Sequence, residues 1–97
     1  MIKIGKKIIG PNHPCTIVAE ISANHNGSFN RMKHLIRAAK KAGADLIKIQ
    51  SYTPDSLTLN SKKKDFLINN PSSPWKNQYL WNLYQKSHTP INWYEKI

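Results

Sequence analysis

The chain is poor in acidic groups, cysteine and long apolar runs. It has five acidic residues against fifteen lysines and arginines, which gives a formal net charge of +10 at pH 7. The single cysteine, Cys15, cannot form an internal disulfide, so a reducing cytoplasmic location is expected, with Cys15 as a packed small side chain. No apolar run approaches the roughly 20 residues of a membrane span, and the first residues lack the apolar core of a signal peptide. No membrane partner is therefore expected.

The excess of positive charge raises one possible function, that of a small basic module that binds nucleic acid. The lysines and arginines are spread over a predicted helix face, a loop and both termini, without a recognisable DNA- or RNA-binding motif. We therefore expect no nucleic-acid partner, and an affinity for random DNA that falls steeply with salt would contradict this expectation.

Two short apolar runs each contain an ionisable residue. The run Thr16 to Ile21 (TIVAEI) includes Glu20, and the run Leu46 to Gln50 (LIKIQ) includes Lys48. Ionised groups are rarely left within a buried strand unless something there needs them. Because successive side chains of a strand point to opposite faces, each strand has one apolar face and one face that becomes polar toward its carboxyl end.

An amphipathic helix is predicted between the two runs, with Ser28 as its N-cap and Gly43 at its left-handed C-terminal position. Its apolar residues recur at steps of three and four: Phe29, Met32, Leu35, Ile36, Ala39 and Ala42. Strand, helix and strand make a βαβ unit with parallel strands and a right-handed crossover. Glu20, Lys48 and Gln50 then meet at one sheet edge, where parallel α/β folds carry ligand sites. A purely structural Glu20–Lys48 ion pair is the alternative, and one pair can serve both purposes.

The loop SANHNGS, residues 22–28, lies at the same edge. Asn and Gly tolerate unusual backbone angles, so turn formation explains part of its composition but not His25. A lone loop histidine is more often exposed to solvent than catalytic, and spacing alone gives His25 no functional role.

The rest of the chain gives further elements. A hairpin is predicted from Ile2–Ile4 and Lys7–Ile9, and the long connection 51–73 is typical of a functional lid or a partly disordered segment. A second helix is predicted from Trp75 or Lys76 to Ser87. Thr89 and Pro90 resemble the cap and first residue of a further helix, INWYEKI. The three tryptophans are interpreted as packing residues of these helices; ligand stacking is the alternative.

The segments AEISANHNGS and AGADLIKIQSYTPDSLT resemble the N-terminal part of the sialic acid synthase family, the phosphoenolpyruvate-dependent nonulosonic acid synthases. The segment PWKNQYLWNLYQKSHTP resembles the pseudaminic acid synthase branch more than the N-acetylneuraminate branch. The resemblance covers nearly the whole chain. It implies an α/β fold, the N-terminal part of a TIM (β/α)₈ barrel preceded by a small β-hairpin. Residues 1–15 would be the hairpin and lead-in, and residues 16–97 the first βα units.

For function, the resemblance implies condensation of phosphoenolpyruvate with an N-acetylated amino sugar, 2,4-diacetamido-2,4,6-trideoxy-altropyranose, to give pseudaminic acid and phosphate. An N-acetylneuraminate or legionaminate synthase is the alternative. Glu20 matches a glutamate implicated in acid/base catalysis, Lys48 a lysine that contacts phosphoenolpyruvate, and Gln50 a glutamine that contacts the sugar. The remaining substrate-binding candidates, in a supporting role, are the loop residues Asn24, His25 and Asn26.

The resemblance also implies a divalent metal (Mn²⁺, Mg²⁺ or Co²⁺) with ligands beyond residue 97, and a homodimer in which a C-terminal antifreeze-like domain completes the neighbouring subunit's site. No residue of this chain is expected to ligate the metal. We expect these 97 residues not to include the antifreeze-like domain, and a complete barrel needs about 250 residues. We therefore expect the 97-residue chain alone to be poorly folded or aggregation-prone, and inactive. An interaction fragment or the remnant of a disrupted gene is a third reading.

Overall fold

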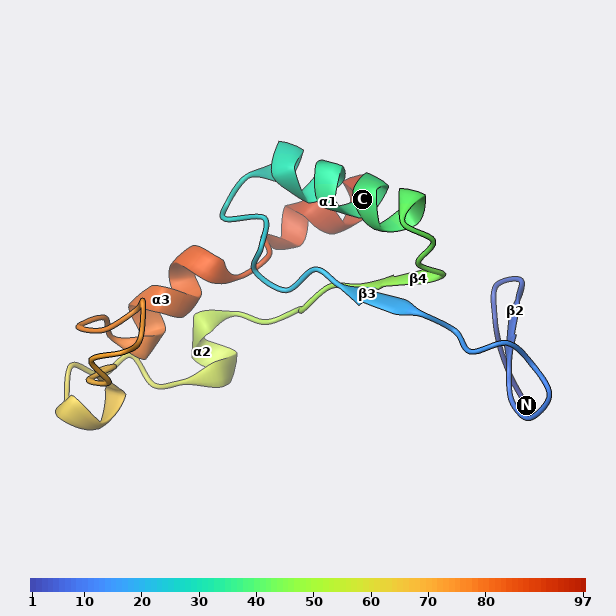
Figure 1. Ribbon diagram of the computed structural model, residues 1–97. Coiled ribbons are helices and arrows are strands. Elements are labelled where there is room, and N and C mark those ends of the chain that lie inside the picture. Colours follow the sequence, from blue (N-terminus) through green and yellow to red (C-terminus); the bar gives the residue numbers. More distant parts are fainter.

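In the computed structural model, which describes residues 1–97, the chain begins with an antiparallel hairpin of β1 (Ile2–Ile4) and β2 (Lys7–Ile9). Gly5 occupies the turn with a φ of 58°, in the left-handed region that tight hairpin turns require. The hairpin lies apart from the other strands (Figure 1). An ion pair between Lys7 and Asp45 joins it to the start of the fourth strand. The structure confirms the predicted hairpin.

The second sheet is a parallel pair of β3 (Val18–Glu20) and β4 (Leu46–Lys48), connected by α1 (Phe29–Lys41). This confirms the predicted strand–helix–strand unit with parallel strands. Both strands are shorter than predicted. Before Val18 the regular ladder ends because the backbone N–H of Ile17 donates to the Asp45 carboxylate at 3.0 Å.

The predicted helix boundaries are confirmed. The Ser28 hydroxyl accepts a hydrogen bond from the backbone N–H of Arg31 at 3.2 Å, which caps the N-terminus of α1. After the helix, Gly43 has a φ of 98°, as the turn back toward the sheet requires.

The predicted apolar faces are covered only in part. Ile21 and Met32 are buried, and Glu20 and Lys48 lie on the open face, as the strand alternation predicts. Ile17 shares the apolar face of this strand with Ile21 by the same alternation, yet it is 55% exposed. The reason is that α1 packs mainly against β4 and leaves the start of β3 uncovered. Cys15 is also exposed, so its predicted packing is wrong.

The connection after β4 contains two short helical turns, α2 (Pro54–Leu57) and the 3₁₀ turn η1 (Lys64–Phe66). The second predicted helix is α3 (Leu80–Ser87), which starts later than expected. The delay has a backbone cause, because Ile68 exchanges hydrogen bonds with the residues just before the helix. Its carbonyl accepts from the Asn77 N–H at 2.7 Å, and its own N–H donates to the Gln78 carbonyl at 2.9 Å.

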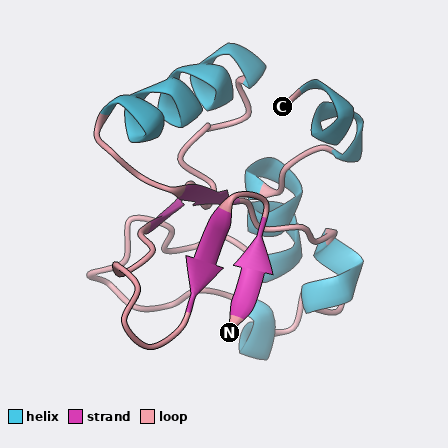
Figure 2. Ribbon diagram, turned by 90° about the vertical axis from the view of Figure 1, so that its right-hand side faces the viewer, coloured by secondary structure: helices cyan, strands magenta, loops and turns pink.

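The last helix differs from the prediction. It is a 3₁₀ helix, η2 (Ile91–Lys96), and Pro90 precedes it with a ψ of 135° instead of forming its first turn. Pro90 occupies the N-cap position predicted for Thr89, and the Thr89 hydroxyl contacts His25. Seen from two directions, η2 and α1 lie on the same side of the parallel strand pair (Figures 1 and 2).

The chain forms an elongated mixed α/β structure with no closed sheet. Its radius of gyration is 17.0 Å, whereas a compact domain of this length has about 12.5 Å. Five of 97 residues are buried, so few tertiary contacts hold the elements together. This low burial supports the expectation that the 97-residue chain alone folds poorly, which stays a prediction; a cooperative melt would contradict it. None of the helices combines the length and the apolar character that crossing a membrane demands.

Candidate active site at the strand edge

Glu20 and Lys48, which we call the strand-edge pair, lie directly opposite each other at the carboxyl ends of β3 and β4. The Lys48 Nζ is 3.0 Å from the Glu20 Oε2, and the side chains are 64% and 37% exposed, respectively. The predicted meeting of the two charges at one edge of the sheet is confirmed. An ion pair as exposed as this one stabilises a fold only weakly. Because both side chains are open to solvent, both charges are accessible to a ligand.

The surroundings of Glu20 favour its ionised form. The hydrogen bond from Lys48 holds the pKa of Glu20 below its ordinary value, and the Ser22 backbone N–H adds to this by donating to Oε1 at 3.3 Å. Glu20 is therefore a carboxylate at neutral pH, able to accept a proton.

Gln50 belongs to the same group of side chains. Its Nε2 donates to the Ser22 hydroxyl at 3.5 Å, so Ser22 lies between Gln50 and the carboxylate of Glu20. Ser22 was not predicted as a site residue. Its signal is its place directly after the strand end, in an unusual backbone conformation with a φ of 50°.

The three loop candidates have different surroundings. The side-chain amide of Asn24 donates to the Ile21 carbonyl at 3.0 Å, and the Asn24 backbone carbonyl accepts from the Arg31 side chain at 2.8 Å. Asn26 is exposed, with a left-handed φ of 50°.

His25, in contrast, has no exposed surface, and the expectation of a solvent-exposed loop histidine is wrong. Thr89 and Trp93, far along the chain, cover its ring. Burial of the ring lowers the pKa of His25, and the nearby His88 lowers it further, so the ring is neutral at pH 7.

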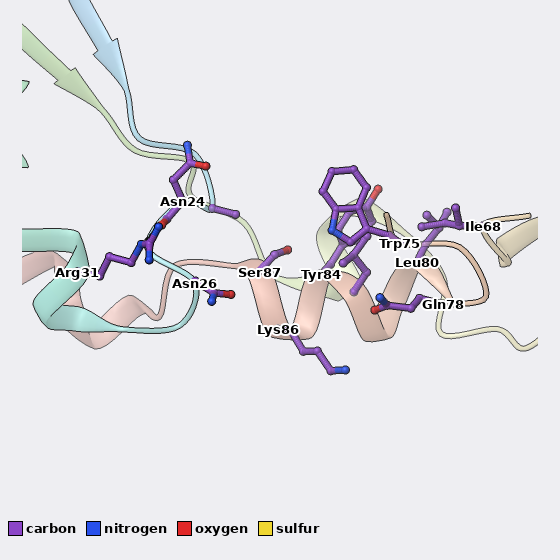
Figure 3. A pocket seen from close by; sticks show the side chains of 12 residues that line it. Asn24, Asn26, Arg31, Ile68, Trp75, Gln78, Leu80, Tyr84, Lys86 and Ser87 are labelled. Carbon is purple, nitrogen blue, oxygen red and sulfur yellow. Dashed lines mark hydrogen bonds between the residues drawn. The ribbon is translucent and has the colours of Figure 1, made fainter. Parts of the chain in front are cut away.

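A cavity of about 780 Å³ lies beside this loop. Asn24, Asn26 and Arg31 line one end of it, and α3 and the turn before α3 line the other (Figure 3). Glu20, Lys48 and Gln50 are not among its lining residues. The structure therefore places the charged candidates at the strand edge and the two asparagines toward the adjacent cavity.

The tryptophans divide between packing and the cavity. Trp93 packs against His25 and Phe29, and Trp81 donates to the Asp55 carboxylate at 2.8 Å. Trp75 lies outside any helix, is 52% exposed and lines the cavity, so its prediction as a helix-packing residue is wrong. The reason is the late start of α3.

The NeuB family model matches residues 35–97, well over half of the chain. The chain belongs to the NeuB family. It is 54% identical over 81 residues to the pseudaminic acid synthase of Campylobacter jejuni, an alignment that covers 84% of this chain and 23% of that protein. It is 45% identical over 84 residues to the pseudaminic acid synthase of Helicobacter pylori, covering 87% and 24%.

A third relative is the N,N'-diacetyllegionaminic acid synthase of Legionella pneumophila, 36% identical over 75 residues, covering 77% of this chain and 21% of that protein. The chain thus spans about a quarter of the length of the curated relatives it matches. These matches confirm the family resemblance and its pseudaminic acid synthase branch.

The residues of this NeuB chain do not form a metal centre by themselves. No three His, Cys, Asp or Glu side chains gather within metal-binding reach. Of the nearest acidic groups, Glu20 is paired with Lys48, and Asp45 with Lys7. Metal ligands beyond residue 97 therefore stay a prediction.

Proposed function

We propose that this chain supplies part of the active site of a pseudaminic acid synthase. That enzyme condenses phosphoenolpyruvate with 2,4-diacetamido-2,4,6-trideoxy-altropyranose and water to give pseudaminic acid and phosphate. The observation that carries the proposal is the strand-edge pair, 3.0 Å apart at the carboxyl ends of two parallel strands in a NeuB chain. The higher identity to two pseudaminic acid synthases than to the legionaminic acid synthase supports this branch over its alternatives.

The proposed fold is the N-terminal part of a (β/α)₈ barrel. Residues 1–15 are its hairpin and lead-in, and β3, α1 and β4 begin the barrel. The parallel pair with its connecting helix supports this assignment, because barrel enzymes carry their active sites at the carboxyl ends of the strands. A cytoplasmic homodimer that uses a divalent metal completes the proposal.

The reaction needs an anion-binding group and a base. The C3 carbon of phosphoenolpyruvate forms a bond to the carbonyl carbon of the open-chain sugar, whose oxygen takes up a proton to become a hydroxyl. Water adds at C2 and gives up a proton, and the C2–O bond to phosphate then breaks with its electron pair leaving on the phosphate as C2 becomes a ketone. The Lys48 ammonium binds the carboxylate or phosphate of phosphoenolpyruvate as a compact charge. Glu20 takes a proton from the water or from a sugar hydroxyl. Gln50 hydrogen-bonds the sugar, and Asn24 and Asn26 support its binding.

The pairing of Glu20 with Lys48 explains why phosphoenolpyruvate would bind before Glu20 takes a proton. In the absence of substrate, Lys48 holds the pKa of Glu20 low. An anionic substrate that takes up the Lys48 ammonium weakens this hold, so the pKa of Glu20 rises and the carboxylate becomes a stronger base. The base is then strengthened when phosphoenolpyruvate is in place.

The test is a comparison of sugars on the complete protein that carries this segment. Phosphate release from phosphoenolpyruvate is measured with the altropyranose, with N-acetylmannosamine and with the legionaminic acid precursor. We expect the highest kcat/KM with the altropyranose. A preference for either other sugar would assign the chain to that branch instead.

The alternative of another class, binding of nucleic acid, is supported only by the net charge of +10. Two of the basic side chains, Lys7 and Lys48, are engaged with carboxylates of the same chain. The family membership favours the enzyme.

A further inference from the structure

The loop between β3 and α1 contains a histidine whose two ring nitrogens are both in use. The backbone N–H of Gly27 donates to Nδ1 of His25 at 3.0 Å, so Nδ1 is an acceptor without a hydrogen. In a neutral ring the hydrogen is then on Nε2, which lies 3.2 Å from the Thr89 Oγ1 and donates to it. The contacts therefore select one tautomer, the neutral ring protonated at Nε2.

The conformation of this loop needs support from outside it. Ser22 and Asn26 both have a φ of 50°, in the left-handed region that non-glycine residues rarely adopt. Such angles persist where the surrounding structure fixes them. Within residues 22–28, His25 is the only fully buried side chain, and its partner Thr89 lies 64 residues further along the chain.

Aromatic packing completes this support. The His25 ring meets Trp93 edge-on with centroids 5.2 Å apart, and Trp93 in turn packs against Phe29 in the first turn of α1, at 5.3 Å. We call His25, Thr89, Trp93 and Phe29 the His25 cluster. Through this cluster, one imidazole ring connects the loop to the start of α1 and to the segment around η2.

The loop in turn contacts the strand edge through one residue. The Ser22 backbone N–H donates to Glu20, and the Ser22 hydroxyl accepts from Gln50. A change in the backbone at Ser22 would therefore move both side chains that the proposed function places on the substrates.

We propose that His25 is a positioning residue. As the Nε2-protonated tautomer it holds the loop 22–28 against Thr89 and Trp93, and through Ser22 it sets the orientation of Glu20 and Gln50. The catalytic consequence rests on the proposed function, whereas the tautomer and the link to Ser22 do not.

The experiment compares Thr89→Val with Thr89→Ser in the complete protein that carries this segment. Serine keeps the hydroxyl that accepts from His25, and valine keeps the shape without it. Because one hydrogen bond to a buried ring is lost, we expect Thr89→Val to lower kcat about fivefold to tenfold. We expect Thr89→Ser to stay within about twofold of wild type, and the KM for phosphoenolpyruvate to change little in both, since Lys48 is not in the loop. A wild-type kcat in Thr89→Val would overturn the proposal.

Nuclear magnetic resonance tests the same proposal without any activity. The ring nitrogens of His25 should show a bare Nδ1 and a protonated Nε2 at pH 7.5, and the Ser22 amide signal should shift in Thr89→Val but not in Thr89→Ser. The opposite tautomer, or an unmoved Ser22 amide, would refute the positioning role. An inactive wild-type protein with the expected spectra would instead refute the proposed function.

His25→Asn is the second variant, for use if Thr89→Val lowers the yield of folded protein. Its side-chain oxygen can still accept from the Gly27 N–H but cannot reach Thr89. We expect the same loss of kcat and the same shift of the Ser22 amide as in Thr89→Val. Wild-type values of both in folded His25→Asn would overturn the proposal.

Discussion

Glu20 and His25 lie five positions apart in the chain, yet their surroundings are opposite. The carboxylate of Glu20 is 37% exposed and charged, and its main partner is a lysine that is itself open to solvent. The imidazole of His25 is neutral and has no exposed surface. An exposed pair can exchange partners with a substrate, whereas a buried ring can only hold its neighbours in place. The comparison separates a residue suited to chemistry from one suited to positioning.

The largest expected effect comes from Glu20→Gln in the complete protein. Loss of the base should lower kcat by about 10²- to 10⁴-fold, while the urea midpoint should hardly move, since the pair is exposed. Phosphate release and urea unfolding measure the two effects. The matched control is Glu95→Gln, at an exposed glutamate of η2, which should keep wild-type kinetics. Similar losses in both variants would abolish the contrast with His25.

His25→Ala, in contrast, should have a large effect on stability. It removes a fully buried ring and leaves the Gly27 N–H and the Thr89 hydroxyl without their partner. We expect the free energy of unfolding to fall by about 2–4 kcal/mol. The same substitution at the exposed His34 of α1 should cost less than about 0.5 kcal/mol. Equal denaturation midpoints for the two variants would show that burial of His25 contributes nothing.

Lys48→Ala tests the other half of the strand-edge pair. Loss of one charge-assisted contact to the anion should lower kcat/KM for phosphoenolpyruvate by about 10- to 100-fold, with a smaller change for the sugar. Initial rates at varied concentrations of each substrate distinguish the two. Lys40→Ala, at an exposed lysine of α1, is the control. An unchanged kcat/KM for phosphoenolpyruvate would remove Lys48 from the site.

The smallest effect is the pH dependence of stability. The folded pKa of His25 is lowered, so below the ordinary value of 6.5 the unfolded chain binds a proton more readily than the folded one. The contribution of the neutral His25 ring to the free energy of unfolding is therefore complete above pH 6.5 and is lost as the pH falls below that value. Urea unfolding at pH 7.5 and 5.5 measures this loss of stability. The control His34→Ala, which keeps His25, should show the full decrease between the two pH values, and His25→Ala should show a weaker one. The same decrease in both would assign it to other groups.

The elements that the sequence predicts well are the local ones. The hairpin, α1 with its Ser28 cap, and the parallel pair all follow from periodicity and turn residues within short segments. The meeting of Glu20 and Lys48 follows in turn, because the parallel direction of the two strands fixes it.

The features that were missed depend on contacts between distant segments. The burial of His25 requires Thr89 and Trp93, and the late start of α3 requires backbone bonds to Ile68. No periodicity near His25 indicates a partner 64 residues away. The same holds for Thr89, whose sequence context favours a helix cap, although its hydroxyl contacts the ring of His25.

The long separation between His25 and Thr89 has a consequence for biosynthesis. A ribosome releases the chain from the N-terminus, so β3 and β4 can pair while the segment around Thr89 is still to be translated. Until Thr89 emerges, the His25 imidazole is solvated and its N–H donates to water instead of to the Thr89 hydroxyl. We expect Glu20 and Lys48 to come together early in the newly made polypeptide, and the loop beside them to reach its final conformation only later.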